Sequence, residues 1–166
     1  MSDIQFRNVR LEDLCRLKEI YTYYIENSTA TFHINKVSDD EMKKILFHED
    51  SLYESFAIIK ENNIIGYVLL APYSKREAFR ISAEVTIYLD NNVTSKGIGY
   101  KALEFIEEVA RKKGIKTLLS LICGENYKSV RLFEKAGYYK CAHMKRVGKK
   151  FDRILDLLIY EKELFE

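Results

Sequence analysis

The chain reads Thr94-Ser95-Lys96-Gly97-Ile98-Gly99-Tyr100-Lys101-Ala102 between a run of β-branched residues and a strongly helical pattern. A glycine-rich turn that opens a helix leaves the first backbone N–H groups without intrahelical partners, and the positive end of the helix dipole lies behind them. Phosphate oxygens fit this arrangement. A glycine also lets the backbone pass close to a ligand, because it has no Cβ. The stretch therefore predicts a phosphate-bearing ligand at the start of a helix, although a Gly-x-Gly alone is also common in simple turns.

The length and composition of the chain indicate one globular domain. With 166 residues it is long enough for one well-buried core and short for two, so we expect a single domain over residues 1–166. It is 47% hydrophobic and 31% charged, as ordinary globular proteins are. The formal net charge is only +2 with both signs scattered, which does not favour nucleic acid or a membrane as partner. We therefore expect a small-molecule partner.

The cysteines and histidines do not form a metal-binding or disulfide pattern. Three cysteines lie far apart in apolar surroundings and are predicted to be core thiols of a reducing compartment: Cys15, Cys123 and Cys141. Three histidines lack metal-ligand spacing and are predicted to lie in loops or on the surface: His33, His48 and His143. The chain has no signal-like first segment and no apolar run of about eighteen residues. The sequence thus predicts a cytoplasmic protein without a metal or a membrane span.

Hydrophobic spacing predicts the element order βαα-βββ-α-β-α-ββ. The expected elements are a strand at 4–9, a helix at 11–24, a helix after Ser38, strands at 55–60, 64–71 and 80–89, a helix from the glycine turn to 113, a strand at 117–123, a helix at 126–136, and strands at 138–146 and 151–161. Ser38 with Glu41 is a capping box. The acidic, asparagine-rich residues 61–63 between two β-branched runs indicate a hairpin turn. Gly114 and Gly137 follow helical patterns, where glycine commonly ends a helix.

Several segments carry a family resemblance, in the right order along nearly the whole chain. They are Ile20-Tyr21 followed by Thr29-Ala30-Thr31-Phe32; Arg76-Glu77-Ala78-Phe79; Ala83-Glu84-Val85-Thr86-Ile87-Tyr88-Leu89; Asn126-x-x-Ser129 before Gly137-Tyr138; and Val147-Gly148-Lys149-Lys150-Phe151 followed by Leu155-Asp156. With the glycine turn, they resemble the GCN5-related N-acetyltransferases (GNAT), and within them the phosphinothricin and methionine sulfoximine acetyltransferase group. The resemblance implies an α/β (α+β) fold: a mixed, mostly antiparallel sheet, splayed between its fourth and fifth strands, with helices on both faces.

The resemblance also implies the activity and the cofactor site. The expected reaction moves the acetyl group of acetyl-CoA to the primary amine of a small amino-acid-like substrate, of the methionine sulfone, methionine sulfoximine or phosphinothricin type. In the family, pantetheine lies between the splayed strands, here 84–89 and 117–123, and the pyrophosphate lies on the glycine turn. The residues implied to bind the cofactor are Ile87, Tyr88, Leu89, Ser95, Lys96, Gly97, Ile98, Gly99, Tyr100, Asn126 and Ser129.

Glu84 is the candidate general base. Acetyl transfer needs a neutral amine, and at physiological pH most substrate amines arrive protonated, so a base must remove that proton. Glu84 is the only carboxylate in the run 81–89, and the resemblance places the family's proposed base at this position. The structural alternative is a salt-bridged or edge-strand glutamate, with Arg80 as a candidate partner. A free N–H near Leu89 is the expected donor to the oxyanion.

The sequence leaves the general acid open. Relatives often carry tyrosine or histidine on the helix after Asn126, at the position of Phe133, which cannot donate a proton. Tyr127 or Tyr138 could replace it, water could do so, or the thiolate could leave unassisted. A second departure is Thr94, where the family usually has arginine or glutamine; we expect weaker cofactor affinity, partly compensated by Lys96.

The resemblance places four residues near the acceptor: Thr31, Phe32, Arg76 and Phe79. A guanidinium fork such as that of Arg76 grips a carboxylate well, although a solvated loop charge is the alternative. Ile154 stands where relatives tend to have tryptophan, so the pocket wall is expected to differ. Family members often pair as dimers, and the aromatic-rich residues 151–160 would suit a homodimer interface.

Two rival functions remain open on the sequence. Gly97-x-Gly99-x-x-Ala102 also fits a dinucleotide-binding fingerprint, and Glu125, after the next strand, could hold a ribose in an oxidoreductase. The motif follows an antiparallel group of strands, however. In a dinucleotide-binding fold it follows the first strand, and parallel βαβ units come after it. The other rival is a non-catalytic acyl-CoA-binding or sensing module, suggested by Phe133 and opposed by Glu84.

Overall fold

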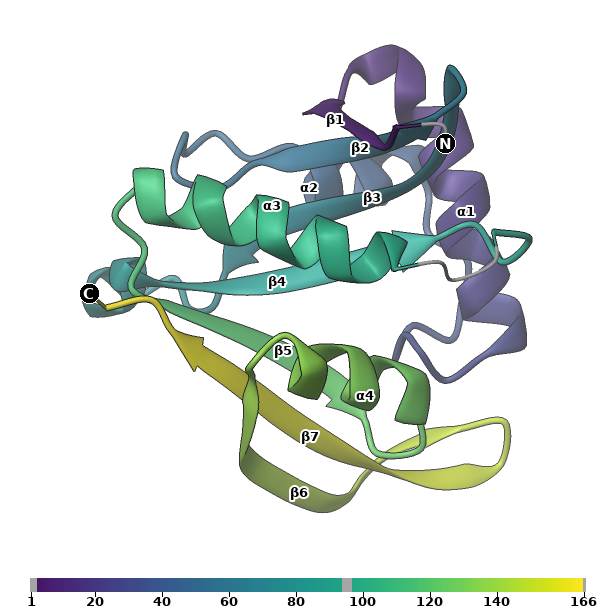
Figure 1. The fold of residues 1–166 in the computed structure, drawn as a ribbon. Coiled ribbons are helices and arrows are strands. Elements are labelled where there is room, and N and C mark those ends of the chain that lie inside the picture. Colours follow the sequence, from purple (N-terminus) through teal and green to yellow (C-terminus); the bar gives the residue numbers. More distant parts are fainter. Residues whose placement is uncertain (1–2, 94–96, 166) are drawn as a thin grey trace.

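Seven strands form one mixed sheet in the computed structural model, which describes residues 3–93 and 97–165. The strands are β1 (Gln5–Asn8), β2 (Ser55–Lys60), β3 (Asn63–Pro72), β4 (Ser82–Leu89), β5 (Thr117–Cys123), β6 (Tyr139–Lys150) and β7 (Arg153–Glu163). The helices are α1 (Leu14–Asn27), α2 (Asp39–Leu46), α3 (Ile98–Lys112) and α4 (Tyr127–Lys135), with short 3₁₀ helices η1 (Leu11–Asp13) and η2 (Glu77–Ile81). In space the strands run β1-β2-β3-β4-β5-β7-β6 (Figure 1).

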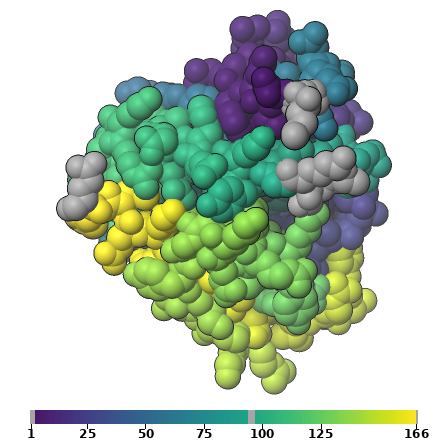
Figure 2. All heavy atoms as spheres, in the orientation of Figure 1, coloured from purple at the N-terminus to yellow at the C-terminus, as the bar shows by residue number. Residues whose placement is uncertain are grey.

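Helices cover both faces of the sheet, as predicted. One apolar cluster packs α3 and α4 against one face, through residues such as Leu103 and Phe133. A second cluster packs α1 and α2 against the other face of β2, β3 and β4, through residues such as Leu17 and Met42. Figure 2 shows the first face, where the side chains of α3 and α4 adjoin. Only β4 and β5 pair in parallel, so the α/β fold with a mostly antiparallel sheet is confirmed.

Local sequence signals form the contacts expected of them. The amide of Glu41 donates to the Ser38 hydroxyl at 3.1 Å, and the amide of Ser38 donates to the Glu41 carboxylate at 2.8 Å, which closes the capping box of α2. Glu61 and Asn62 have φ of 50° and 63°, the left-handed pair that a tight hairpin between β2 and β3 requires. The predicted hairpin is therefore present.

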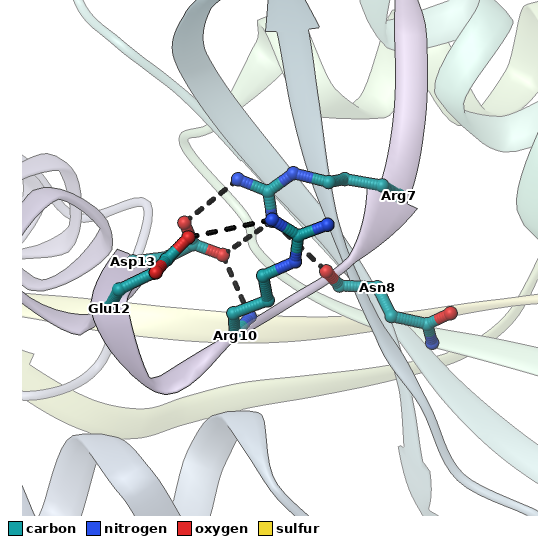
Figure 3. Close-up of polar contacts among 5 residues, drawn as sticks. All are labelled: Arg7, Asn8, Arg10, Glu12 and Asp13. Atoms are coloured by element: carbon teal, nitrogen blue, oxygen red, sulfur yellow. Dashed lines mark hydrogen bonds and ion pairs between the residues drawn. The ribbon is translucent and has the colours of Figure 1, made fainter.

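An ion pair fixes the connection from β1 to α1 (Figure 3). The Arg7 guanidinium donates to both carboxylate oxygens of Asp13, at 2.7 and 2.9 Å, and the backbone amide of Arg10 donates to the same carboxylate at 2.7 Å. Asp13 is buried, and the hydrogen bonds from Arg7 hold the pKa of its carboxyl below the ordinary value. A buried carboxylate satisfied in this way sets the entry of α1, which borders the site below.

Several element boundaries differ from the sequence prediction. Residues 80–81 belong to η2, so β4 begins at Ser82. Strand β6 extends to Lys150, β7 begins two residues later than predicted, and Phe151 and Asp152 join them with φ of 51° and 56°. Because neither turn residue is glycine or asparagine, the sequence carried little signal for this turn. Helix α4 begins at Tyr127, with Asn126 as its cap.

The cysteine prediction was wrong for two of the three thiols. Cys123 is buried, whereas Cys15 and Cys141 are exposed and none of the three is disulfide-bonded. Among the described residues, no group of three or more histidine, cysteine and acidic side chains is arranged to hold a metal ion. In the part of the chain described by the structure, no helix has the length and apolarity needed to cross a membrane.

Candidate functional site

The sheet opens between β4 and β5. Their parallel pairing covers only three positions, from Ser82 opposite Thr117 to Glu84 opposite Leu119. Beyond Glu84, β4 stays paired with β3, and β5 stays paired with β7, so the two strands diverge. The predicted splay is present, and it begins at the candidate base.

Backbone groups of β4 face this opening. In an antiparallel pair, successive residues direct their N–H and C=O groups alternately toward and away from the neighbouring strand. The amide of Asp90 donates to the carbonyl of Ile65 at 2.7 Å, so Asp90 faces β3. Ile87 and Leu89 therefore direct their backbone groups away from β3 and into the opening. The carbonyl of Leu89 accepts a hydrogen bond from the Tyr24 hydroxyl, which leaves the Leu89 N–H as the group free to meet a ligand.

A cavity of about 940 Å³ crosses the sheet at the opening. Its walls come from α1, α2 and the segment between them on one side, from β3, β4 and β5, and from α3 and α4 on the other side. The structure brings twelve of the residues considered from the sequence to this cavity: Thr31, Phe32, Glu84, Ile87, Tyr88, Leu89, Gly97, Gly99, Tyr100, Asn126, Ser129 and Phe133. These residues are far apart in the chain, from Thr31 to Phe133, and the fold brings them together around one cavity.

Other predicted residues lie away from this cavity. Arg76 and Phe79 are exposed in the connection from β3 to β4 and do not line it. Ile98, the first residue of α3, is buried in the core. Tyr127 is 66% exposed, and Tyr138 is buried with a hydroxyl that has no described partner; neither lines the cavity. The predictions for Thr94, Ser95 and Lys96 lie outside the described residues.

The two glycines of the turn, Gly97 and Gly99, have different structural roles. Gly97 caps α3 in the left-handed region, with φ of 77°, and no atom lies within 4 Å of where its Cβ would be. A Cβ on Gly99 would lie 2.9 Å from Cδ2 of Leu132, so this glycine permits α3 and α4 to pack closely. Gly97 therefore supplies the turn that opens α3, and Gly99 permits the close approach of the two helices.

Glu84 is a partly buried carboxylate without a cation. It lies opposite Ala71 on β3 and opposite Leu119 on β5. Among the described residues it forms no salt bridge, and burial raises the pKa of its carboxyl. Arg80, the partner considered from the sequence, instead pairs with Asp50. The pairing of Glu84 with Arg80 is therefore wrong.

The segment between α1 and α2, residues 28–33, lies along one side of the opening and is called the strap below. Three consecutive residues of it are held by three different elements. The Thr29 hydroxyl donates to Glu125 at 2.6 Å, the Tyr88 hydroxyl donates to the carbonyl of Ala30 at 3.1 Å, and Lys150 donates to the carbonyl of Thr31 at 2.9 Å. Sequence reasoning missed these contacts, because they join residues that lie 58 to 119 positions apart.

The same contacts exclude the dinucleotide interpretation. The carboxylate of Glu125, considered as a ribose ligand, accepts hydrogen bonds from Thr29 at 2.6 Å and from Arg153 at 2.7 Å. The sheet also lacks a series of parallel βαβ units, since β4 and β5 are its only parallel pair among the described strands. The glycine turn therefore belongs to a different kind of site.

Comparisons with known proteins agree with this architecture. A family model described as an acetyltransferase (GNAT) domain matches residues 6–159. A phosphinothricin N-acetyltransferase of Streptomyces coelicolor is 26% identical, over 98% of this chain and 98% of that protein. An L-methionine sulfoximine/L-methionine sulfone acetyltransferase of Salmonella typhimurium is 27% identical, over 93% of this chain and 91% of that protein. The crystal structure of a GNAT superfamily phosphinothricin acetyltransferase from Sinorhizobium meliloti, in complex with AcCoA, superposes with a TM-score of 0.89 at 26% identity, covering 97% of this chain and 88% of that one.

Proposed function

Because the chain belongs to the GNAT family of acetyltransferases, whose acetyl donor is acetyl-CoA, we propose that it acetylates the primary amine of a small amino-acid-like molecule with Glu84 as the general base. One observation carries this proposal. Glu84 lies where β4 and β5 separate, lines the cavity, and has no described cation partner. A carboxylate in such surroundings retains the capacity to take a proton, because burial raises its pKa toward neutrality.

The residues present fit acetyl-CoA. The strands separate where pantetheine needs room, Ile87 and Leu89 direct backbone groups into that space, and Gly97 opens α3 in the left-handed conformation. When bound, acetyl-CoA supplies the thioester carbon that the amine attacks. The N–H of Leu89 then stabilises the negative charge that develops on the carbonyl oxygen. The N–H groups at the start of α3 favour a pyrophosphate, with Ser95 and Lys96 as further ligands.

Asn126 and Ser129, which the resemblance places at the cofactor, also hydrogen-bond to each other at the start of α4. The Asn126 side chain caps α4: its oxygen accepts from the Ser129 amide at 3.3 Å, and its amide group donates to the Ser129 hydroxyl at 3.0 Å. Both residues line the cavity. We propose that they hold the start of α4 against the cofactor, to which the Ser129 hydroxyl and the second N–H of the Asn126 amide group can donate.

The leaving thiolate has no tyrosine acid in this proposal. Phe133 lines the cavity and carries no hydroxyl, while Tyr127 and Tyr138 do not line it. Burial also raises the pKa of Tyr138, which opposes any exchange of its proton. Of the alternatives considered from the sequence, we therefore favour a thiolate that leaves unassisted or takes its proton from water.

We propose an acceptor of the kind named for the two relatives above, such as methionine sulfone, methionine sulfoximine or phosphinothricin. Thr31 and Phe32 of the strap line the side of the cavity that such an amine would occupy. The proposed enzyme is a single domain over residues 1–166, and its cytoplasmic location stays a prediction from the sequence.

A homodimer is also part of the proposal. Leu121, Ile159 and Ala142 lie opposite one another across β5, β7 and β6. Further apolar side chains of this half of the sheet are exposed: Met144, Val147, Phe151 and Ile154. Exposed apolar surface of this kind supports an interface near the strands expected from the sequence. Sedimentation of the protein over a range of concentrations tests this assembly.

A thiol-release assay tests the proposed reaction. Acetyl-CoA is supplied with methionine sulfone, methionine sulfoximine, phosphinothricin, free amino acids and polyamines, and acetyl-CoA binding is measured in parallel by calorimetry. We expect turnover with at least one amino-acid-like amine. Acetyl-CoA binding without turnover of any amine in this panel would reject the acceptor class, and turnover of polyamines alone would replace it.

A further inference from the structure

The last turn of α2 borders the acceptor side of the cavity, a role that sequence reasoning did not assign to it. Lys44, Ile45 and His48 line the cavity together with Ala71, the residue opposite Glu84 on β3. His48 lies two residues beyond the end of α2, after the extended residue Phe47, and contributes to the same cavity wall as Lys44 and Ile45. The α2 side of the cavity therefore contains a basic residue and an imidazole, and Glu84 contributes to the same cavity.

Two buried polar groups of this cavity have no protein partner among the described residues. They are Nε2 of His48 and the hydroxyl of Tyr67, whose residue is fully buried on β3. Buried donors and acceptors are almost always satisfied, by protein, water or ligand. Both residues line the same cavity as Glu84. The unmatched groups point to a polar ligand on this side of the sheet.

The charges of this region complement a zwitterion. Lys44 forms no salt bridge in the described part of the chain. The other basic side chains that line the cavity, Lys128, Arg131 and Lys135, belong to or adjoin α4 on the opposite face of the sheet. Burial lowers the pKa of His48, which favours the neutral imidazole, and among the described residues that line the cavity Lys44 is the only lysine or arginine on the α1 and α2 side of the sheet. Arg76 lies outside the cavity and does not supply this charge.

We propose that Lys44 binds the carboxylate of the acceptor, with His48 as a hydrogen-bonding neighbour, while the amine of the same molecule lies at Glu84. This inference rests on the proposed function and makes its acceptor class specific: an amine that also carries a carboxylate. An ammonium near an anionic wall and a carboxylate near a cationic wall would orient the molecule before reaction. Lys44 is then a specificity-determining residue.

The test compares two acceptors and two variants. Methionine sulfone carries a carboxylate, and 3-(methylsulfonyl)propan-1-amine is the same molecule without it. Lys44→Met is compared with Lys43→Met, because Lys43 is the preceding residue of α2, does not line the cavity and contacts only Asp40 at 3.9 Å among described acidic groups. Both substitutions keep good helix formers.

We expect Lys44→Met to raise KM for methionine sulfone by about 10- to 100-fold with little change in kcat, as for a lost charged hydrogen bond. The carboxyl-free amine should be unaffected, and Lys43→Met should resemble the wild type with both acceptors. Equal losses on the two acceptors, or equal effects of the two variants, would overturn the inference.

Binding separates this inference from the proposed reaction. Methionine sulfone is titrated by calorimetry into the CoA-loaded protein. Suppose that the wild type acetylates no amino acid but binds the sulfone, and that Lys44→Met binds it about 10-fold more weakly. That result would support the acceptor subsite and reject the proposed reaction. If the wild-type protein did not bind the sulfone, the subsite would be rejected.

Discussion

The ammonium group of Lys150 donates a hydrogen bond of 2.9 Å to the carbonyl oxygen of Thr31, although 119 residues separate them in the chain. Lys150 is 3% exposed and lies at the end of β6, beside the turn into β7. Burial lowers the pKa of its side chain. This contact joins the C-terminal hairpin to the strap, and so connects a distant part of the sheet with the acceptor side of the cavity.

Lys150→Met is expected to loosen the strap. The variant leaves the buried Thr31 carbonyl without its donor, which costs about 1–3 kcal/mol of unfolding free energy in denaturant titrations. Because Thr31 and Phe32 line the cavity, KM for the acceptor should rise while the Kd of acetyl-CoA stays unchanged. Lys149→Met is the control, since Lys149 is exposed and lies 3.9 Å from the exposed Asp152. Equal effects of the two variants would contradict a special role for Lys150.

Glu84→Gln is expected to lower kcat by about 10²- to 10⁴-fold, the usual contribution of a general base. The amide keeps the size of the side chain, so calorimetry should find acetyl-CoA bound as in the wild type. Lower turnover with unchanged donor affinity would separate proton removal from cofactor binding. Wild-type turnover with every accepted amine would reject Glu84 as the base.

The pH dependence follows from the raised pKa of Glu84. A base acts only when ionised, so the acidic limb of kcat/KM should lie above pH 4.5, the ordinary pKa of glutamate, and should vanish in Glu84→Gln. The folded state holds this proton more tightly than the unfolded state, so the contribution of Glu84 to stability is present below pH 4.5 and is lost as pH rises through the folded pKa. The stability of Glu84→Gln relative to wild type should therefore grow over that window in denaturant titrations at a series of pH values.

Gly97→Val is expected to weaken acetyl-CoA binding, measured by calorimetry. Valine disfavours the left-handed conformation at φ of 77°, which costs about 1–3 kcal/mol unless the turn rearranges. Gly114→Val is a matched control, because Gly114 has φ of 79°, has no atom within 4 Å of a built Cβ, and does not line the cavity. Both variants should lose stability, and only Gly97→Val should lose affinity. Unchanged affinity in Gly97→Val would remove the glycine turn from the cofactor site.

Tyr138→Phe is expected to leave kcat unchanged and to keep or raise stability. The substitution removes a buried hydroxyl that has no described partner, and such a group costs about 1–3 kcal/mol when buried. The ring contact with Phe133, at 4.9 Å between centroids, is retained. Initial rates and thermal unfolding measure both effects. A large loss of kcat without loss of stability would indicate that Tyr138 is the general acid of the reaction.

Sequence reasoning identified the order of elements because each depends on neighbouring residues. The box of Ser38 and Glu41, the turn at residues 61–63 and the glycine before α3 are local signals, and all three formed as expected. The splay followed from a family resemblance rather than from any local pattern. Hydrophobic spacing alone does not reveal that pairing of β4 with β5 stops at Glu84.

The positions of individual side chains relative to the cavity depend on distant contacts. Tyr138 and Tyr127 were equivalent in the sequence, yet one is buried and the other is exposed. Arg76 lies outside the cavity, while Lys44, with no motif around it, lies in its wall. Which polar side chain meets a cavity depends on the packing of α2 against the sheet, and no spacing within one element encodes that packing.

A cavity that crosses the sheet has a kinetic consequence. The strap lies on the side of α1 and α2, whereas the glycine turn and α4 border the other side, so in the proposed reaction the acetyl donor and the amine would approach from opposite faces. Neither molecule must leave before the other enters, and no chain nucleophile has to store the acetyl group between them. Double-reciprocal plots of rate against acetyl-CoA, taken at several acceptor concentrations, should therefore give intersecting lines.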